Sequence, residues 1–441
     1  MRMPSRGRIA LLLSAAALAW LGGCQGKSTT RAPSANGHFE FVMGTELYAT
    51  PDVAMPAKGT SFTDPTFHTT IVRVTDGAED GYIGPGIQNE YSKMDPENED
   101  GALLILRGNS AAYYLYDPSS YQMLQQLTVF DSCCCQEPEP RWDPADPQVF
   151  YYVCGAELRS YDVAAATSAS VHDFRGELPA GASIRTKMEG DPSLDRRYFA
   201  FIVEDDSWNF LAVVVYDRVQ DEIVGQKTDG FPDSINWVGM SMSGDHCIVG
   251  YEDVAMYTDI FSRDFSTRTT LPDGSAGHGD AALTADGRDV YVYQNVRTDQ
   301  IAMADMETGI ETPLLDIPFD VNTDIGLHIS GNCSGTPGWV LVSTYGAMNP
   351  PPGEHHAWLD EQLFMLELKE GPRVWRVAHT HAYTHENAEE GEKNYFAEAF
   401  AAINTPGTRI YFGSNWESFV ADYSEAYQIL LPAGWTESMP P

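Results

Sequence analysis

One pattern of strands and turns repeats along most of this chain and limits its fold more than any other feature. In each copy a turn rich in Gly, Asp or Pro precedes an alternating run of β-branched and aromatic residues. A second run follows, as in residues 195–202 (DRRYFAFI) and 212–217 (AVVVYD). The turns lie near residues 100, 146, 195, 244, 287, 335 and 407. Such alternation predicts strands, and strand units that recur at roughly this spacing are typical of a β-propeller.

The repeat predicts an all-β, seven-bladed propeller in which each copy forms one four-stranded blade. The first run of a copy is expected to be the second strand of its blade, and the next run the third. Residues 69–74 (TTIVRV) are expected to close the ring by pairing with the last blade. Residues 40–75 leave room for an eighth, degenerate blade, and an array of two-sheet sandwiches is the alternative fold.

The amino terminus has the pattern of a bacterial lipoprotein export signal. Three arginines precede an apolar run at residues 9–21, and the sequence LGGC occupies residues 21–24. The apolar run is too short to span a bilayer, which requires about 20 residues. We therefore expect Cys24 to become the lipid-carrying amino terminus. A short membrane anchor and an ordinary secretory signal are the alternatives.

This signal divides the chain into three predicted parts. Residues 1–23 would be the signal peptide, residues 24–37 a flexible tether, and residues 38–441 the propeller domain. Gln25 follows the lipidated cysteine where an aspartate would retain a lipoprotein at the inner membrane, which favours the outer membrane. The predicted location is the bacterial cell envelope, and the lipid would be the only contact with the membrane.

The chain is strongly acidic, with 63 Asp and Glu against 27 Lys and Arg. Five of the basic residues precede residue 37, where no acid occurs, so the remaining 22 leave the globular part with an excess of 41 negative charges. Such a charge repels DNA, RNA and anionic lipid headgroups, so nucleic acid is not an expected partner. Solubility in a salty medium explains the charge, and recruitment of divalent cations is the alternative.

Six cysteines remain besides Cys24, an even number that permits three disulfides in an exported protein. Three of them are consecutive at residues 133–135, and neighbouring cysteines cannot bridge without strain. One of the three is expected to bond Cys154 across a local hairpin. A soft-metal or redox site is the alternative.

Two strings give the chain a resemblance to known propeller families. Residues 283–293 (LTADGRDVYVY) with residues 304–309 (ADMETG) resemble the repeats of TolB-type periplasmic propellers. Residues 277–286 (GHGDAALTAD) and residues 396–415 resemble the oligogalacturonate lyase family. That resemblance implies seven blades, a divalent metal held by histidines at the channel mouth, and a basic residue that abstracts a proton beside a uronate carboxylate.

The lyase resemblance is incomplete at the expected metal site. His278 matches the position of one ligand, but Ala397, Glu398 and Ala399 stand where the family has a pair of histidines. Glu398 is then the one plausible ligand at that point. An acidic protein is also a poor binder of polyuronate, which requires cationic neutralisation.

Connections into the inner strands of a propeller converge near its axis, so polar residues there are candidate site residues. In chain order they are Lys187, Glu189, Asp191, His278, Asp280, Asp324, His328, His379, His381, His385 and Glu398. His379 and His381 are two apart and would point the same way on an extended segment. Imidazole and carboxylate groups are suitable ligands for Mn²⁺ or Zn²⁺.

These residues receive three predicted roles. The predicted metal ligands are His278, His379, His381 and Glu398. The predicted ligand-binding residues are Glu189, Asp191 and Asp280. The candidate catalytic residues are Lys187, His328 and His385. Ordinary hydrogen bonding within loops is the alternative for each histidine.

The sequence therefore predicts a lipid-anchored binding or scaffold propeller of the cell envelope, with a carbohydrate or protein ligand at the channel mouth. The alternative is a metal-dependent polysaccharide lyase of the oligogalacturonate type. No nucleophile elbow, P-loop or dinucleotide fingerprint occurs, so chemistry that depends on those motifs has no support.

Overall fold

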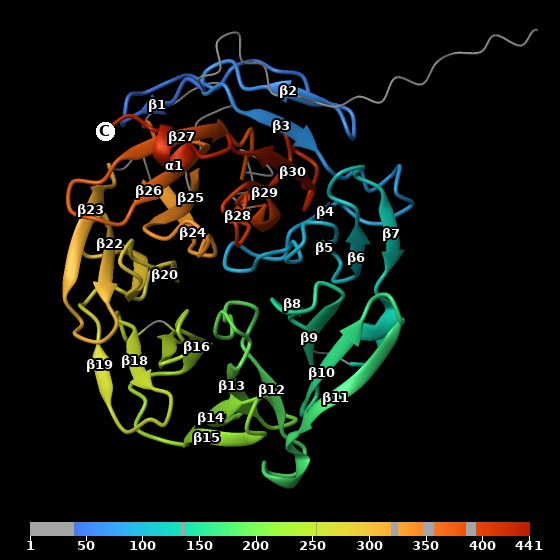
Figure 1. Cartoon of the computed structure of the whole chain (residues 1–441), viewed down its shortest axis with the longest axis vertical. Coiled ribbons are helices and arrows are strands. Elements are labelled where there is room, and N and C mark those ends of the chain that lie inside the picture. The colour runs from blue at the N-terminus through green and yellow to red at the C-terminus, as the bar shows by residue number, and fades with distance from the viewer. Residues whose placement is uncertain (1–38, 134–136, 253, 319–324, 347–356, 385–393) are drawn as a thin grey trace, which may run out of the picture. The chain divides into compact units, whose positions relative to one another are not determined.

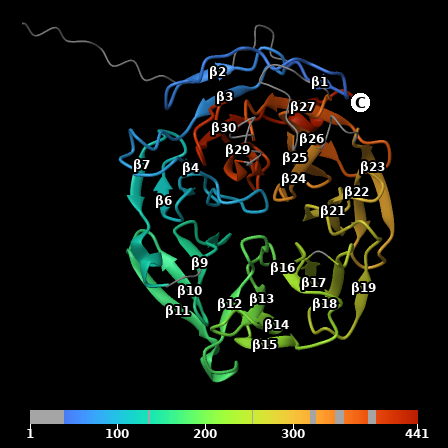
Figure 2. The ribbon, with the colours of Figure 1, turned by 180° about the vertical axis from the view of Figure 1, so that it is seen from behind.

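The fold is an all-β ring of seven sheets, as the repeat predicts (Figure 1). The computed structural model describes residues 39–133, 137–252, 254–318, 325–346, 357–384 and 394–441. In blades 1 to 5 the strands run outward in chain order, whereas blades 6 and 7 carry amino-terminal strands on their outer edges. Every hydrogen-bonded pair of these strands is antiparallel. Seen from behind, the same ring of blades surrounds the axis (Figure 2).

The first four blades each contain four strands. Blade 1 comprises β4 (Ile87–Gln88), β5 (Leu104–Gly108), β6 (Tyr113–Tyr116) and β7 (Met123–Gln126). Blade 2 comprises β8 (Arg141–Trp142), β9 (Val149–Cys154), β10 (Glu157–Asp162) and β11 (Thr167–Asp173). Blade 3 comprises β12 (Ser183–Arg185), β13 (Tyr198–Glu204), β14 (Phe210–Asp217) and β15 (Glu222–Lys227). Blade 4 comprises β16 (Ile235–Met240), β17 (His246–Tyr251), β18 (Asp259–Ser262) and β19 (Arg268–Thr270).

The last two blades gain strands from the amino-terminal part of the chain. Blade 5 comprises β20 (Gly279–Leu283), β21 (Asp289–Asn295), β22 (Gln300–Asp305) and β23 (Glu311–Asp316). Blade 6 comprises β24 (Ile325–Ser330), β25 (Trp339–Gly346), β26 (Gln362–Glu367) and β27 (Val374–His379), with β1 (Val42–Met43) on its outer edge. Blade 7 comprises β28 (Ala402–Ile403), β29 (Arg409–Ser414), β30 (Glu425–Leu430), β3 (Thr70–Arg73) and β2 (Ser61–Thr63).

Four short helices complete the described elements. They are η1 (Thr128–Ser132), η2 (Phe174–Gly176), η3 (Tyr395–Ala397) and α1 (Trp435–Ser438). No helix in the described part of the chain has both the length and the apolar character needed to cross a membrane.

The ring closes as predicted, because β3 pairs antiparallel with β30 from residue 70 to residue 73. The segment that could have formed an eighth blade instead supplies β1, β2 and β3 to blades 6 and 7. The predicted second and third strands of all seven blades are also confirmed, since they correspond to β5–β6 and to the equivalent strand pairs of the other blades. Buried aliphatic and aromatic side chains from neighbouring blades pack between the sheets, and this packing forms the core.

The cysteines are only partly paired. Cys154 at the end of β9 bonds Cys133, which directly follows η1, so the predicted partner group is confirmed although the bond does not cross a hairpin. Cys247 and Cys333 are free and buried within blade packing, which contradicts three disulfides. Cys134 and Cys135 lie outside the described residues.

A fully buried carboxylate fixes the amino-terminal segment against blade 6. Asp64 accepts hydrogen bonds from the backbone amides of Thr66 and Phe67 at 2.8 and 2.9 Å. It also accepts one from the backbone amide of His379 at 3.0 Å. These contacts hold the turn that leads into β3 against the outer strand β27 of blade 6. Asp64 therefore supports the pairing of β3 that closes the ring.

Replacement of Asp64 by alanine leaves three backbone amides without their acceptor. We expect Asp64→Ala to lower the free energy of unfolding by about 3 kcal/mol, because buried donors lose charge-assisted hydrogen bonds. Urea denaturation of the purified protein measures the change. Asp52→Ala removes an exposed carboxylate of the same segment and is the matched control. Equal stability of the two variants would contradict the role of Asp64.

Candidate functional site

Side chains from five blades meet near the axis of the ring. The connection after β4 supplies Lys93 and the connection after β12 supplies Glu189. These two connections extend inward from their blades in Figure 1. His278 directly precedes β20, His328 lies within β24, and Glu398 precedes β28. We call these five residues the axial cluster.

A buried ion pair forms one side of the axial cluster. The Lys93 ammonium lies 3.0 Å from the Glu189 carboxylate and 3.7 Å from the centroid of the Trp237 ring. Burial raises the pKa of Glu189, but the Lys93 ammonium opposes this, and the pKa lies below its usual value overall. Glu189 is therefore ionised and neutralises Lys93.

Two stacked histidines form the other side. The rings of His278 and His328 lie 4.6 Å apart with an interplanar angle of 17°. His278 Nδ1 lies 2.8 Å from the carbonyl oxygen of Leu327, which fixes Nδ1 as the protonated nitrogen. His328 Nε2 lies 3.0 Å from a Glu398 carboxylate oxygen. His328 then carries its proton on Nε2, and its Nδ1 has no hydrogen-bond partner among the described residues.

Both histidines are held neutral. Burial, together with the neighbouring His328, lowers the pKa of His278 to about 4. Burial lowers the pKa of His328 to about 3. At neutral pH the two histidines of the axial cluster are therefore uncharged, and they can donate or accept hydrogen bonds in that state.

Aromatic rings surround this polar group. Tyr345 stacks on His328 with ring centroids 5.2 Å apart. Tyr91 and Phe400 approach the same imidazole at 5.2 and 4.8 Å. A few polar groups within an aromatic wall are typical of a small-molecule site.

The other predicted ligand-binding residues support the loops around the cluster. Asp191 pairs with the buried guanidinium of Arg141. Asp280 accepts hydrogen bonds from the backbone amides of Ala281 and Gly331, both at 2.8 Å. Burial raises the pKa of Asp280 to about 8. Asp191 and Asp280 thus hold backbone and side chains that shape the site.

His379 and His381 belong to a different part of the fold. His379 ends β27, which is three strands out from the inner strand of blade 6, and its Nδ1 lies 3.1 Å from Asp64. His381 stacks on Trp416 with ring centroids 4.3 Å apart. The expectation of an extended pair is wrong because His381 adopts a left-handed backbone with φ of +50°. The two rings lie 6.2 Å apart, inclined at 53°.

The described residues do not fit the divalent metal that the lyase resemblance implies. No three His, Cys, Asp or Glu side chains among them are arranged to hold one ion. The near-parallel rings of His278 and His328 cannot aim their in-plane lone pairs at one ion within about 2.1 Å. Glu398 is engaged with His328, and His385 and Asp324 lie outside the described residues.

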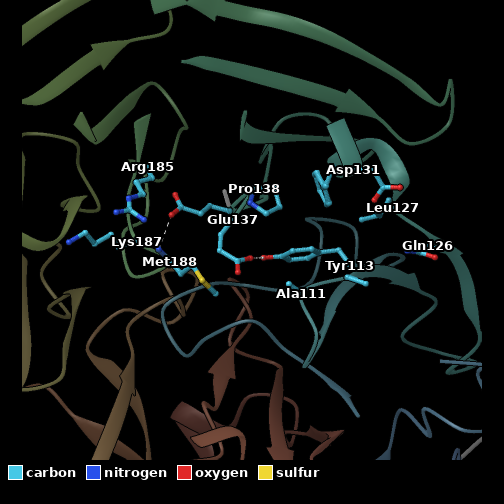
Figure 3. A pocket seen from close by; sticks show the side chains of 13 residues that line it. Ala111, Tyr113, Gln126, Leu127, Asp131, Glu137, Pro138, Arg185, Lys187 and Met188 are labelled. Carbon is cyan, nitrogen blue, oxygen red and sulfur yellow. Dashed lines mark hydrogen bonds between the residues drawn. The ribbon is translucent and has the colours of Figure 1, made fainter. Parts of the chain in front are cut away.

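Lys187 lies two residues before Glu189 in the chain and lines two clefts. Its ammonium donates a hydrogen bond of 2.7 Å to the carbonyl oxygen of Ile235. One cleft, of about 480 Å³, lies between blades 1, 2 and 3. Figure 3 shows this cleft with Arg185 and Lys187 on one side and Tyr113 and Leu127 on the other. The second cleft lies between blades 3 and 4 and has a volume of about 570 Å³.

Sequence reasoning missed Lys93, the only lysine or arginine of the axial cluster. The sequence did contain an indication of Lys93, because residues 92–96 (SKMDP) resemble residues 186–192 (TKMEGDP). Both strings occupy the connection after the inner strand of a blade. The second string contains Lys187 and Glu189, which the sequence did single out, so the repeat would have pointed to Lys93.

Comparison with known proteins identifies the architecture. No family model matches the sequence, and no curated protein matches it either. An oligogalacturonate lyase in complex with manganese aligns with a TM-score of 0.58 and 17% identity, covering 86% of this chain and 99% of that chain. An oligogalacturonate lyase from Vibrio parahaemolyticus gives a TM-score of 0.57 and 14% identity, covering 86% of this chain and 100% of the other.

The chain has the fold of the oligogalacturonate lyases. The predicted resemblance is confirmed at that level, and at this identity the likeness shows the fold alone. The catalytic and binding roles assigned from the sequence stay predictions.

The pKa values of the axial histidines have a direct consequence. The ring signals of His278 and His328 in an NMR titration should keep their neutral positions from about pH 8 down to about pH 5. His172 is the control, because burial lowers its pKa but Glu177 and Asp221 raise it above the usual value overall. A titration midpoint of either axial histidine near 6.5 would contradict the buried, stacked arrangement.

Proposed function

We propose that this protein is an exported, lipid-anchored propeller that binds a neutral carbohydrate at the axial cluster. The observation that carries this proposal is the meeting of ionised, neutral polar and aromatic groups from five blades. Glu189 and His278 are only half-buried, so they retain access to a ligand. Sugar hydroxyls are suited to such groups because each can donate and accept a hydrogen bond.

The charges at the cluster favour a ligand without carboxylates. Glu189 neutralises Lys93, both histidines are uncharged, and Glu398 adds a further acid. The whole chain also has a formal net charge of −36. The carboxylates of a polyuronate would be repelled by this negative field and would find no free cation in the axial cluster to pair with. A neutral saccharide has no carboxylates and is not repelled.

A metal-dependent polysaccharide lyase is the second candidate, and the shared fold favours it. A lyase would need a base near the sugar ring and a group that neutralises the uronate carboxylate. His278 or His328 could accept a proton, but Lys93 is already paired with Glu189. The binding function agrees better with this charge distribution.

Export is supported by the disulfide between Cys133 and Cys154. Disulfides form and persist in oxidising compartments such as the periplasm and the cell surface. The proposed lipid attachment at Cys24 and the tether lie outside the described residues. The outer membrane remains the proposed location.

Replacement of Glu189 by glutamine removes the counter-ion of Lys93 with little change in shape. We expect Glu189→Gln to weaken binding of a neutral oligosaccharide by at least about tenfold, since a buried ammonium is left unpaired. Calorimetric titration with gluco-, manno- and xylo-oligosaccharides measures the effect, and exposed Asp206→Asn is the control.

The same panel includes oligogalacturonate with and without Mn²⁺. Tighter binding of oligogalacturonate than of every neutral sugar would contradict the proposal, as would formation of unsaturated uronate product. Unchanged affinity in Glu189→Gln would contradict the role of the axial cluster.

Removal of the predicted lipidation site tests the anchor separately. Expression of Cys24→Ser in a Gram-negative host should abolish incorporation of labelled palmitate and move the protein from the membrane fraction to the soluble fraction. The Cys247→Ser variant, expressed in the same way, is the control. It also loses one cysteine, but Cys247 is buried in blade 4 and cannot carry the lipid. Membrane retention of Cys24→Ser would contradict lipid anchoring.

A further inference from the structure

The cleft between blades 3 and 4 contains the most exposed tryptophan of the described residues. Trp208 lies in the turn between β13 and β14, and its residue surface is 49% exposed. Phe210, the first residue of β14, is 37% exposed and lines the same cleft. Large aromatic groups are costly to leave in water, so their presence at one cleft calls for an explanation.

The turn holds Trp208 in one orientation. Asp205 Oδ1 accepts hydrogen bonds from the backbone amides of Ser207 and Asn209, both at 2.9 Å. The backbone amide of Trp208 donates to the Asp205 carbonyl oxygen at 3.0 Å. Trp208 has a φ of +64°, a conformation that costs energy for a bulky residue and persists only where its surroundings enforce it.

A cation fixes the indole from one side. The Arg185 guanidinium carbon lies 4.5 Å from the Trp208 ring centroid, and Arg185 is itself paired with Glu204. Cation–π contact of this kind favours one ring position. The exposed remainder of the indole is therefore a rigid, flat apolar surface, which loses little conformational freedom when a ligand stacks on it.

Hydrogen-bonding groups surround this aromatic surface. Asn209, Thr228, Asp229 and Ser234 line the cleft and are exposed. Lys187, which lines the cleft, donates to the carbonyl oxygen of Ile235, and Arg185 is paired with Glu204. The Lys227 ammonium lies over the ring of Phe231, 5.5 Å from its centroid. A flat apolar patch within a rim of amide, hydroxyl and carboxylate groups matches a pyranose, which has an apolar C–H face and a hydroxyl edge. The volume of about 570 Å³ is in the range of small-molecule pockets.

The backbone connects this cleft to the axial cluster. Lys187 lines the cleft, and Glu189 of the axial cluster follows two residues later. Consecutive Cα atoms are about 3.8 Å apart, so the Cα atoms of these two residues lie within about 7.6 Å of each other. The backbone at Lys187 and Glu189 therefore places the cleft close in sequence to the axial cluster.

We infer that the cleft at Trp208 is a second saccharide subsite, at which one ring of a neutral oligosaccharide stacks on the indole. The inference rests on the proposed function, since the remainder of the ligand would occupy the axial cluster. It assigns the protein an oligosaccharide rather than a monosaccharide or disaccharide as its ligand.

The test compares a hexasaccharide with a disaccharide of the best-binding neutral sugar. Trp208→Ala should weaken hexasaccharide binding by about tenfold and leave disaccharide binding unchanged. Trp208→Tyr should restore most of the affinity, and Phe419→Ala, which removes an exposed aromatic ring that contacts Tyr383, is the matched control. Thermal melting confirms that each variant is folded.

A second measurement separates this subsite from the axial cluster. In Glu189→Gln, the hexasaccharide should still quench tryptophan fluorescence, and the additional Trp208→Ala change should abolish that quench. Absence of a Trp208-dependent quench overturns the subsite, as does an equal loss for both sugar lengths. A Trp208-dependent quench together with unchanged affinity in Glu189→Gln overturns the axial proposal alone. Preference of the cleft for an apolar peptide over every saccharide also overturns the subsite.

Discussion

Antiparallel pairing of β3 with β30 is the contact on which the rest of the structure depends. It joins residues 70–73 to the last strands of the chain, so the ring is closed by backbone hydrogen bonds rather than by side-chain packing alone. Without this pairing blade 7 would expose an unpaired strand edge. Asp64 secures the approach to β3, because it binds both its own turn and the backbone of His379.

A closed ring explains how residues far apart in sequence form one site. Lys93 and Glu398 are separated by most of the chain, yet both belong to the cluster. Lys93 pairs with Glu189, His278 stacks on His328, and His328 contacts Glu398. The charge of Glu189 acts on the pKa of His278 and so relates the two groups. Each side chain enters from the inner end of its own blade, and its position depends on the blade stacking. The cluster is buried enough to keep two histidines neutral, which leaves it with hydrogen-bonding capacity and little positive charge.

The blades were predictable because strand alternation and turn residues are local signals. Each predicted second and third strand corresponds to an observed pair, such as β13 and β14. The site was predictable only in part. Glu189, His278, His328 and Glu398 could be singled out because they lie in or beside inner strands, although Glu189 follows its inner strand rather than leading into it. The prediction that His379 and His381 join the same site was wrong. Residue spacing shows neither the left-handed backbone at His381 nor the contact between His379 and Asp64.

A neutral saccharide that binds between the axial histidines and the Lys93–Glu189 pair is the central proposal for this protein. A crystal structure of the protein soaked with the tightest-binding neutral oligosaccharide tests this most directly. We expect sugar hydroxyls within hydrogen-bond distance of Glu189 and His278, with the Lys93–Glu189 pair intact. A sugar bound only on the outer surface of the blades, with the axial cluster free of it, would contradict the account.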